Sequence, residues 1–265
     1  MDYLFSPDNW EWVLTGNNAR FIFEGFLVNL QLALIAMVCS LVVGLALALL
    51  RLANLRPVSV AAGVWIDVFR NLPLIFLMLY LALAMPLSWR TAYEDVAPGF
   101  LPDVLENGRV FAALLALVLY NSAVLAEIMR AGILSLSRGQ GEAAAALGLS
   151  YAQSMRIVIL PQGLRRMVPA TVSQLITLNK DTTLVSIIAI QEVVRHGRIV
   201  TGFNFFGGVQ APVLHVFIFI GVLFILANLA LSRLSRRLEL REQRRSGTTV
   251  SPVVGAEDQV ATVTP

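Results

Sequence analysis

The stretch from Phe26 to Leu50 reads FLVNLQLALIAMVCSLVVGLALALL and contains no Asp, Glu, Lys, Arg or His. A helix needs about 20 consecutive apolar residues to cross the hydrocarbon core of a bilayer, which is about 30 Å thick. This stretch meets that length, and inside a bilayer its backbone groups find partners only if the segment is helical. It therefore predicts a membrane-spanning helix.

Four further segments extend the pattern along the chain. Val110–Ala131 and Ala211–Leu231 are apolar over a membrane-spanning length. Val60–Leu87 is interrupted by charges in its first half, and Met167–Ile190 is a weaker candidate that carries several polar residues. We therefore predict an all-α, polytopic membrane protein with about five transmembrane helices.

Composition agrees with this fold class. The 265 residues are 57% hydrophobic and 14% charged, with a mean hydropathy of +0.73, whereas soluble chains carry about 45–50% apolar and about 25% charged residues. Lys180 is the one lysine, and the arginines lie between apolar runs rather than on one polar face, which argues against nucleic-acid binding. One cysteine and two histidines without neighbouring ligands predict no disulfide and no metal site.

The arginine distribution predicts the orientation, because cytoplasmic loops carry an excess of Lys and Arg. If the N-terminus lies outside, the inner loops hold Arg51, Arg56, Arg130, Arg138, Arg156, Arg165, Arg166, Arg233, Arg236, Arg237, Arg241, Arg244 and Arg245. The outer loops then hold only Arg20, Arg90, Arg109, Arg195 and Arg198. This excess favours an N-terminus outside and a cytoplasmic C-terminus.

Three regions follow from these spans. Residues 1–24 form an extracytoplasmic N-terminal segment, and residues 25–235 form the transmembrane domain. Residues 236–265 are predicted to be a cytoplasmic tail, disordered because it shows no helical period. Within the transmembrane domain, residues 135–162 form a long cytoplasmic loop.

This loop predicts two short helices joined by a turn. Its signals are two candidate capping boxes, Ser137 with Gln140 and Ser150 with Gln153, the Ala-rich run Glu142–Leu147, the terminator Gly148, and Pro161. Gly148 stands where a left-handed residue would end the first helix. Pro161 would stop the second helix or begin the next span. The loop would thus present a rigid helix-turn-helix to another protein.

Ionisable residues inside the predicted spans each cost about 2.5–3.5 kcal/mol and need partners or water. They are Asp67, Arg70, Glu127, Lys180 and Asp181. One hypothesis is that these residues form charge pairs between helices and so fix the bundle, and we favour it for Asp67, Arg70 and Glu127. The other places them along a solute path. For the group Asn121, Asn179, Asp181, Thr182 and Thr183 the path is a serious alternative, because these side chains supply the donors and acceptors that a zwitterion requires.

The loop resembles the EAA loop of ATP-binding-cassette importer permeases. The matching residues are Gly139-Gln140, Glu142-Ala143-Ala144, Gly148 and Leu160-Pro161, with Val158 where the family usually has Ile. Further stretches, Arg70–Leu74, Ala126–Ile133, Lys180–Leu184 and Gln191–Val193, are similar to the polar amino acid permeases, although Asn71 and Leu72 depart from that pattern. The resemblance covers about residues 26–231.

The resemblance implies the type I importer permease fold and a multi-pass subunit of the bacterial cytoplasmic membrane that carries a polar amino acid of the glutamate or glutamine type. It implies four kinds of partner: ATP-binding-cassette ATPase subunits, a second permease subunit that is identical or paralogous, an extracytoplasmic amino acid-binding protein, and membrane lipid. In that family the loop docks on the ATPase, and the fourth span lines the path.

The sequence predicts no catalytic residue and no bound cofactor in this chain. A phosphate-binding loop needs Gly-x-x-x-x-Gly-Lys-Ser/Thr, and Lys180 follows Leu178 and Asn179 instead. ATP and Mg²⁺ are therefore expected on the partner ATPase. The alternative is an ion-coupled secondary amino acid transporter that uses Glu127 and Asp181, but such carriers usually contain an internal repeat, and none is apparent.

Overall fold

The computed structural model describes residues 2–97, 99, 103–202 and 211–246, and every regular element within these ranges is helical. The elements in chain order are α1 (Asp2–Phe5), η1 (Pro7–Trp10), α2 (Glu11–Leu14), α3 (Asn18–Arg51), α4 (Arg56–Asn71), α5 (Leu74–Ala84), α6 (Leu87–Val96), α7 (Asp103–Glu106), α8 (Gly108–Leu134), α9 (Arg138–Ala146), α10 (Tyr151–Ser154), η2 (Met155–Ile159), α11 (Leu160–Asp181), η3 (Thr182–Ile188), α12 (Val193–Gly202) and α13 (Val213–Ser246).

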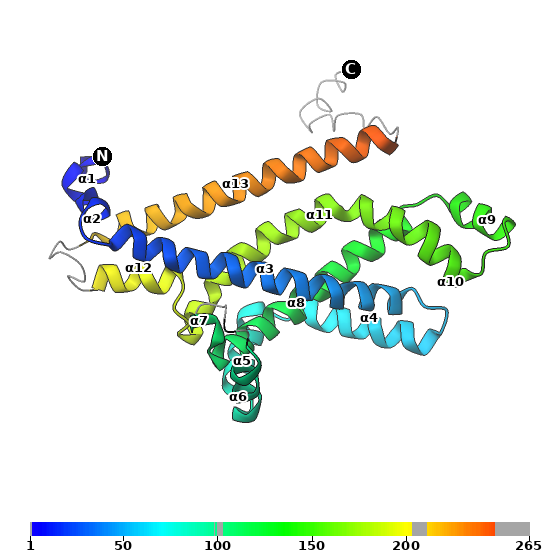
Figure 1. The fold of residues 1–265 in the computed structure, drawn as a ribbon, viewed down its shortest axis with the longest axis horizontal. Helices are drawn as coiled ribbons and strands as arrows, with labels where there is room; N and C mark the ends of the chain where they lie inside the picture. Colours follow the sequence, from blue (N-terminus) through cyan, green and yellow to red (C-terminus); the bar gives the residue numbers. More distant parts are fainter. Residues whose placement is uncertain (1, 98, 100–102, 203–210, 247–265) are drawn as a thin grey trace, which may run out of the picture.

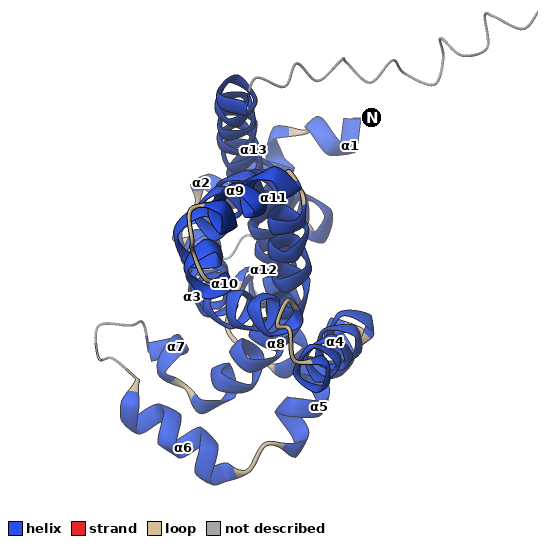
Figure 2. Ribbon diagram, turned by 90° about the vertical axis from the view of Figure 1, so that its right-hand side faces the viewer, coloured by secondary structure: helices blue, strands red, loops and turns tan. Residues whose placement is uncertain are grey.

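Four long helices, α3, α8, α11 and α13, run along the long axis of the molecule (Figure 1). Helix α3 packs on α8, and α11 packs on both α8 and α13. The short helices α9 and α10 lie at one end, and α1, α2 and α12 lie at the other. Figure 2, viewed along this axis, shows that α5, α6 and α7 stand to one side of the bundle.

Three helices, α3, α8 and α13 up to Arg241, are long and apolar enough to cross a membrane. They correspond to three of the predicted spans. Helices α4 and α5 pass the same test only as a pair, and they are bent by 98° at the break between them. The chain therefore has up to four candidate spans among its described residues.

The predicted span Val60–Leu87 is broken into two helices, and Pro73 explains the break. Helix α4 ends at Asn71, and Leu72 is extended, with a ψ of 134°. A residue before proline is pushed out of the helical region by the proline ring. Pro73 itself stands at the N-cap of α5, so the helix restarts there in a new direction.

Two predicted boundaries also shift. Helix α3 begins at Asn18, inside the region predicted as the N-terminal segment. Helix α13 continues to Ser246, so the predicted disordered tail is helical over its first part, and its remainder, residues 247–265, lies outside the described residues. The predicted fourth span, Met167–Ile190, is split between α11 and η3, because the α-helix ends at Asp181.

A buried polar network fixes the bundle where α3, η3 and α12 meet. The Asn29 amide nitrogen on α3 donates to Thr182 Oγ1 and to Glu192 Oε2, each at 3.1 Å. Its oxygen accepts from the Val193 backbone N–H at 3.1 Å. Glu192 Oε1 accepts from the Arg195 N–H at 2.9 Å, beside the first turn of α12.

Asn29, Thr182 and Glu192 are fully buried. A buried polar group without a partner costs about 1–3 kcal/mol, so each member of this network depends on the others. The network joins α3, the start of η3 and the start of α12, which are far apart in sequence. It therefore holds the non-α-helical turn after α11 in one position.

Replacing Asn29 with Ala is expected to lower the stability of the purified protein by about 2 kcal/mol, because it leaves the Glu192 carboxylate and the Val193 N–H without their buried partner. The measurement is the thermal unfolding midpoint in detergent. Asn71→Ala is the matched control, since Asn71 is exposed and its amide only donates to Asp67 O within α4. Equal midpoints for the two variants would contradict the role given to Asn29.

Candidate functional site

The turn between α9 and α10 is built by local backbone rules. Gly148 has a φ of 79°, which confirms the predicted left-handed terminator. Ser150 Oγ accepts from the Gln153 N–H, and the Gln153 side chain accepts from the Ser150 N–H, which confirms the second capping box. The first predicted box is wrong, because the Ser137 side chain makes no cap hydrogen bond.

The two faces of α9 differ. Ala144 is buried, and its helix packs on η2. Glu142 and Ala143 are exposed, and Leu147 at the end of the helix is 82% exposed. An exposed carboxylate beside alanines and one leucine allows another protein to approach closely and to bury apolar surface. This face is the site that the EAA-like pattern predicts.

Side-chain hydrogen bonds attach this helix-turn-helix to the long helices. Tyr151 Oη donates to Leu52 O, just beyond the end of α3, at 3.1 Å. Gln162 Nε2 on α11 donates to Gln140 Oε1 on α9 at 3.3 Å. These contacts connect both short helices to elements of the bundle.

A glycine crossing fixes α8 against α11 close to the same end. A Cβ added to Gly132 would lie 2.9 Å from Gly163 O, and one added to Gly163 would lie 2.9 Å from the Ile133 Cα. The two backbones are therefore too close for any larger residue. Arg166 reinforces the crossing by donating to Ser135 O at 2.8 Å. A displacement of α10 along α11 would thus reach α8.

The helix that leads from the turn into α11 contains one π-helical segment, η2, between α10 and Leu160. Pro161 follows at the start of α11, where a missing N–H does little harm. Pro161 therefore begins a new helix, as one of the two predicted alternatives has it. A π-bulge changes the direction of the side chains that follow it, and such bulges are frequent at functional sites.

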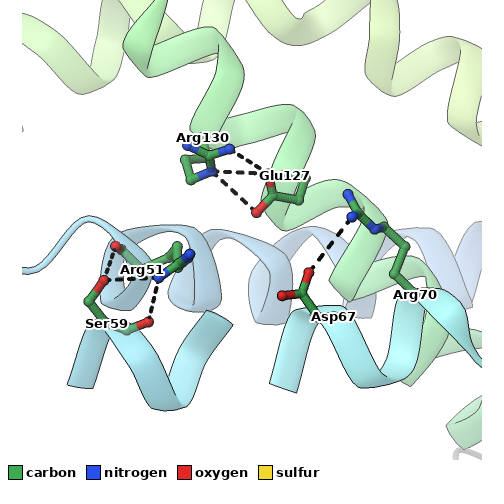
Figure 3. A network of polar contacts seen from close by, with 6 residues as sticks. All are labelled: Arg51, Ser59, Asp67, Arg70, Glu127 and Arg130. Carbon is green, nitrogen blue, oxygen red and sulfur yellow. Dashed lines mark hydrogen bonds and ion pairs between the residues drawn. The ribbon is translucent and has the colours of Figure 1, made fainter. Parts of the chain in front are cut away.

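Charged residues meet where α3, α4 and α8 come together (Figure 3). Glu127 pairs with Arg130 at 2.8 Å, and Asp67 pairs with Arg70 at 3.7 Å. Both pairs lie within one helix, at a spacing of three residues. Arg51 donates instead to Ser59 O at 3.0 Å.

Asp67 and Arg70 therefore form a charge pair as predicted, but within α4, and no ion pair of Asp67, Arg70 or Glu127 joins two helices among the described residues. Lys180, which belonged to the same predicted set, forms no ion pair among the residues that the structure describes. The Glu127 carboxylate is engaged by Arg130 through three hydrogen-bond contacts. This engagement leaves Glu127 less free to bind a solute.

The predicted path residues separate into a buried set and a half-buried set, and the half-buried set comprises Glu127, Asp181 and Thr183. Asn121, Asn179 and Thr182 are buried. Asn121 Oδ1 accepts from Gln174 Nε2 at 2.7 Å, and Asn179 Nδ2 donates to Asn228 Oδ1 on α13 at 3.2 Å. These three side chains join helices within one chain, so they do not line an open surface of it.

The opposite face of α11 carries an exposed polar stripe. Ser173, Thr177 and Lys180 follow one another at helical spacing, and all three are exposed. Asp181 and Thr183 border the stripe and are half-buried. The sequence analysis did not identify Ser173 and Thr177, although their spacings of seven and three residues from Lys180 place all three on one helical face.

This chain is similar to known membrane transport proteins. The family model "Binding-protein-dependent transport system inner membrane component" matches residues 40–241. A probable glutamine ABC transporter permease protein of Bacillus subtilis is 36% identical, over 84% of this chain and 94% of its own. A glutamate transport system permease protein of Corynebacterium glutamicum is 33% identical, over 90% of this chain and 82% of its own.

Solved structures show a similar fold. A crystal structure of an amino acid ABC transporter with histidines superposes with a TM-score of 0.69, at 27% identity, over 84% of this chain and 94% of that chain. An inward-facing methionine ABC transporter, at 19% identity and a TM-score of 0.56, is similar in fold.

The exposed stripe generates a labelling prediction. In a Cys39→Ser background, Thr177→Cys is expected to react with a membrane-impermeant maleimide at least about tenfold faster than Leu178→Cys, because Leu178 is fully buried. The measurement is the rate of modification in membranes by mass spectrometry. Val222→Cys on α13 is the second control, since Val222 is 44% exposed within an apolar span. Thr177→Cys reacting as slowly as Val222→Cys would mean that the stripe faces lipid.

Proposed function

The chain belongs to the family of binding-protein-dependent transport system inner membrane components, and from this membership we propose that it is the permease subunit of an ATP-driven importer for glutamate or glutamine. The observation that carries the proposal is the exposed Glu142 face on a helix-turn-helix that hydrogen bonds attach to the membrane helices. The relatives named for glutamine and glutamate support the solute class.

The face formed by Glu142, Ala143 and Leu147 binds the ATPase subunit. When ATP draws two ATPase subunits together, each pulls its own copy of this helix-turn-helix. Tyr151 and Gln162 pass the displacement to α3 and α11, and the Gly132–Gly163 crossing passes it to α8. The loop therefore carries a coupling free energy between the nucleotide state and the membrane state.

The stripe of Ser173, Thr177 and Lys180 lines the solute path. These side chains are exposed in the single chain, and hydroxyl groups with an ammonium group cannot face hydrocarbon without cost. A path between two permease subunits hydrates them. Lys180 then provides a positive charge for a solute carboxylate, and the hydroxyl groups provide hydrogen bonds for its amino and amide groups.

The same proposal fixes the orientation and the partners. The end with α9 and α10 lies in the cytoplasm, and the end with α1, α2 and α12 lies outside, where an amino acid-binding protein delivers the solute. ATP and Mg²⁺ bind the ATPase subunits. The ion-coupled alternative loses its basis, because Glu127 is paired with Arg130 and the family assignment supports ATP coupling.

Glu142→Lys is expected to lower ATP-dependent uptake at least about tenfold while the protein stays folded in the membrane, because the exposed carboxylate would become a cation at the ATPase interface. The measurement is uptake of labelled glutamate and glutamine into proteoliposomes that contain the complete importer. Glu239→Lys is the matched control, since Glu239 is an exposed carboxylate near the C-terminal end of α13, which lies at the same end of the molecule as α9 (Figure 1).

Wild-type uptake in these proteoliposomes tests the function itself. Purification of the tagged full-length chain from native membranes would first show whether an ATPase subunit and a second permease subunit accompany it. ATP-dependent uptake of neither amino acid would refute the solute class. Equal uptake by Glu142→Lys and Glu239→Lys would refute the role of the loop.

A further inference from the structure

A cavity of about 280 Å³ lies between α5, α6, α8 and η3, where α5 and α6 stand to one side of the bundle (Figure 2). Its walls are apolar except for two arginines, Arg90 of α6 and Arg109 of α8. The apolar part comprises Leu79, Leu83, Ile187 and Ile188, together with one alanine. Small-molecule sites usually measure about 300–1,000 Å³, so this cavity suits a solute the size of an amino acid.

Neither guanidinium group is neutralised by an ion pair with a described residue. Among the described residues, Arg90 and Arg109 form no ion pair. Arg90 donates one hydrogen bond to Ala82 O, and its Nε is buried without a partner. A buried donor without an acceptor is costly, and two cations at one apolar cavity repel each other. A bound anion would relieve both penalties.

Other contacts hold Arg90 in place. Tyr93, one turn further along α6, stacks on Phe111 and donates to Leu105 O at 2.7 Å. Glu94 accepts from the Gly108 N–H at 2.7 Å, so its carboxylate serves the start of α8 rather than Arg90. A Cβ on Gly108 would lie 2.7 Å from the Arg90 Cβ. Helix α6 is therefore fixed on α8, and the cavity is preorganised.

Helix η3 connects the cavity to the proposed solute path. Helix η3, which supplies Ile187 and Ile188, begins immediately after Lys180 and Asp181. A second cavity of about 250 Å³ touches Arg109 from the other side, where Asp103 is the one acidic wall residue. Arg109 is exposed, so a solute in the surrounding water can reach it.

From this geometry we infer that Arg90 and Arg109 form an outer capture site for the side-chain carboxylate of an acidic amino acid. The inference rests on the proposed function for its solute class. Guanidinium groups bind carboxylates through two parallel hydrogen bonds, and the methylene groups of the solute contact the apolar wall. The site selects glutamate over glutamine, because the amide of glutamine carries no charge to compensate the arginines.

Protection from chemical modification tests the site without any need for transport. The complete importer, purified in detergent, is treated with phenylglyoxal, and the modification rate of each arginine is followed by mass spectrometry. Glutamate is expected to slow the modification of Arg109 by about tenfold, and glutamine by less than about twofold. Arg195 is the internal control, because it is exposed on α12 and does not line the cavity.

Three results would overturn the site: no protection of Arg109 by glutamate, equal protection by glutamine or by inorganic phosphate, or equal protection of Arg195. A transport experiment gives a second reading. Arg109→Gln is expected to lower glutamate uptake about tenfold relative to glutamine uptake, whereas Arg195→Gln leaves the ratio unchanged. An equal loss of both amino acids in Arg109→Gln would assign Arg109 to gating or docking and overturn its role in capture.

The two hypotheses fail in different ways. If the wild-type importer shows no ATP-dependent uptake of either amino acid, the proposed function fails. The protection of Arg109 by glutamate still tests whether the capture site exists. If uptake is normal and Arg109 is not protected, only the capture site fails.

Discussion

A polar group inside the hydrocarbon core of a membrane must find its partner within the protein, and the arrangement of this chain depends on that constraint. Asn29 lies in an apolar helix and binds Thr182, Glu192 and the Val193 backbone. By satisfying Thr182, it determines which face of α11 and η3 is turned inward. The opposite face, with Thr177 and Lys180, is consequently turned outward.

The contact between Gly132 of α8 and Gly163 of α11 serves to transmit movement between two helices in the proposed mechanism, rather than to satisfy buried polar groups. Two helices that cross through glycines have no side chains between their backbones, so neither can shift without the other. Gly132 and Gly163 form this contact close to α9 and α10. The Glu127–Arg130 pair lies on the same part of α8 and stabilises the helix that transmits the displacement in the proposed coupling. Resistance to deformation is what a coupling element requires.

The sequence predicts features whose physical cause is local. Hydropathy predicts α3, α8 and α13, and the chemistry of Gly148 and Ser150 predicts the turn between α9 and α10. Features that depend on distant partners are not predicted. Thr182 and Asn29 are 153 residues apart, so nothing near Thr182 indicates that it is buried. Pro73 signals a break, but the 98° bend depends on what α5 packs against.

The exposed polar stripe on α11 indicates that a single chain leaves part of its surface unsuited to lipid. The exposed positions of α13 in its apolar span are occupied by residues such as Val222, Ile225 and Leu226, which suit lipid. The stripe of Thr177 and Lys180 does not, since a lysine in hydrocarbon costs about 2.5–3.5 kcal/mol. One chain alone would have to accept this cost. In the proposed assembly, a second permease subunit facing the stripe removes this cost by enclosing water between the two subunits, so the surface that needs a partner is also the proposed path for a charged solute.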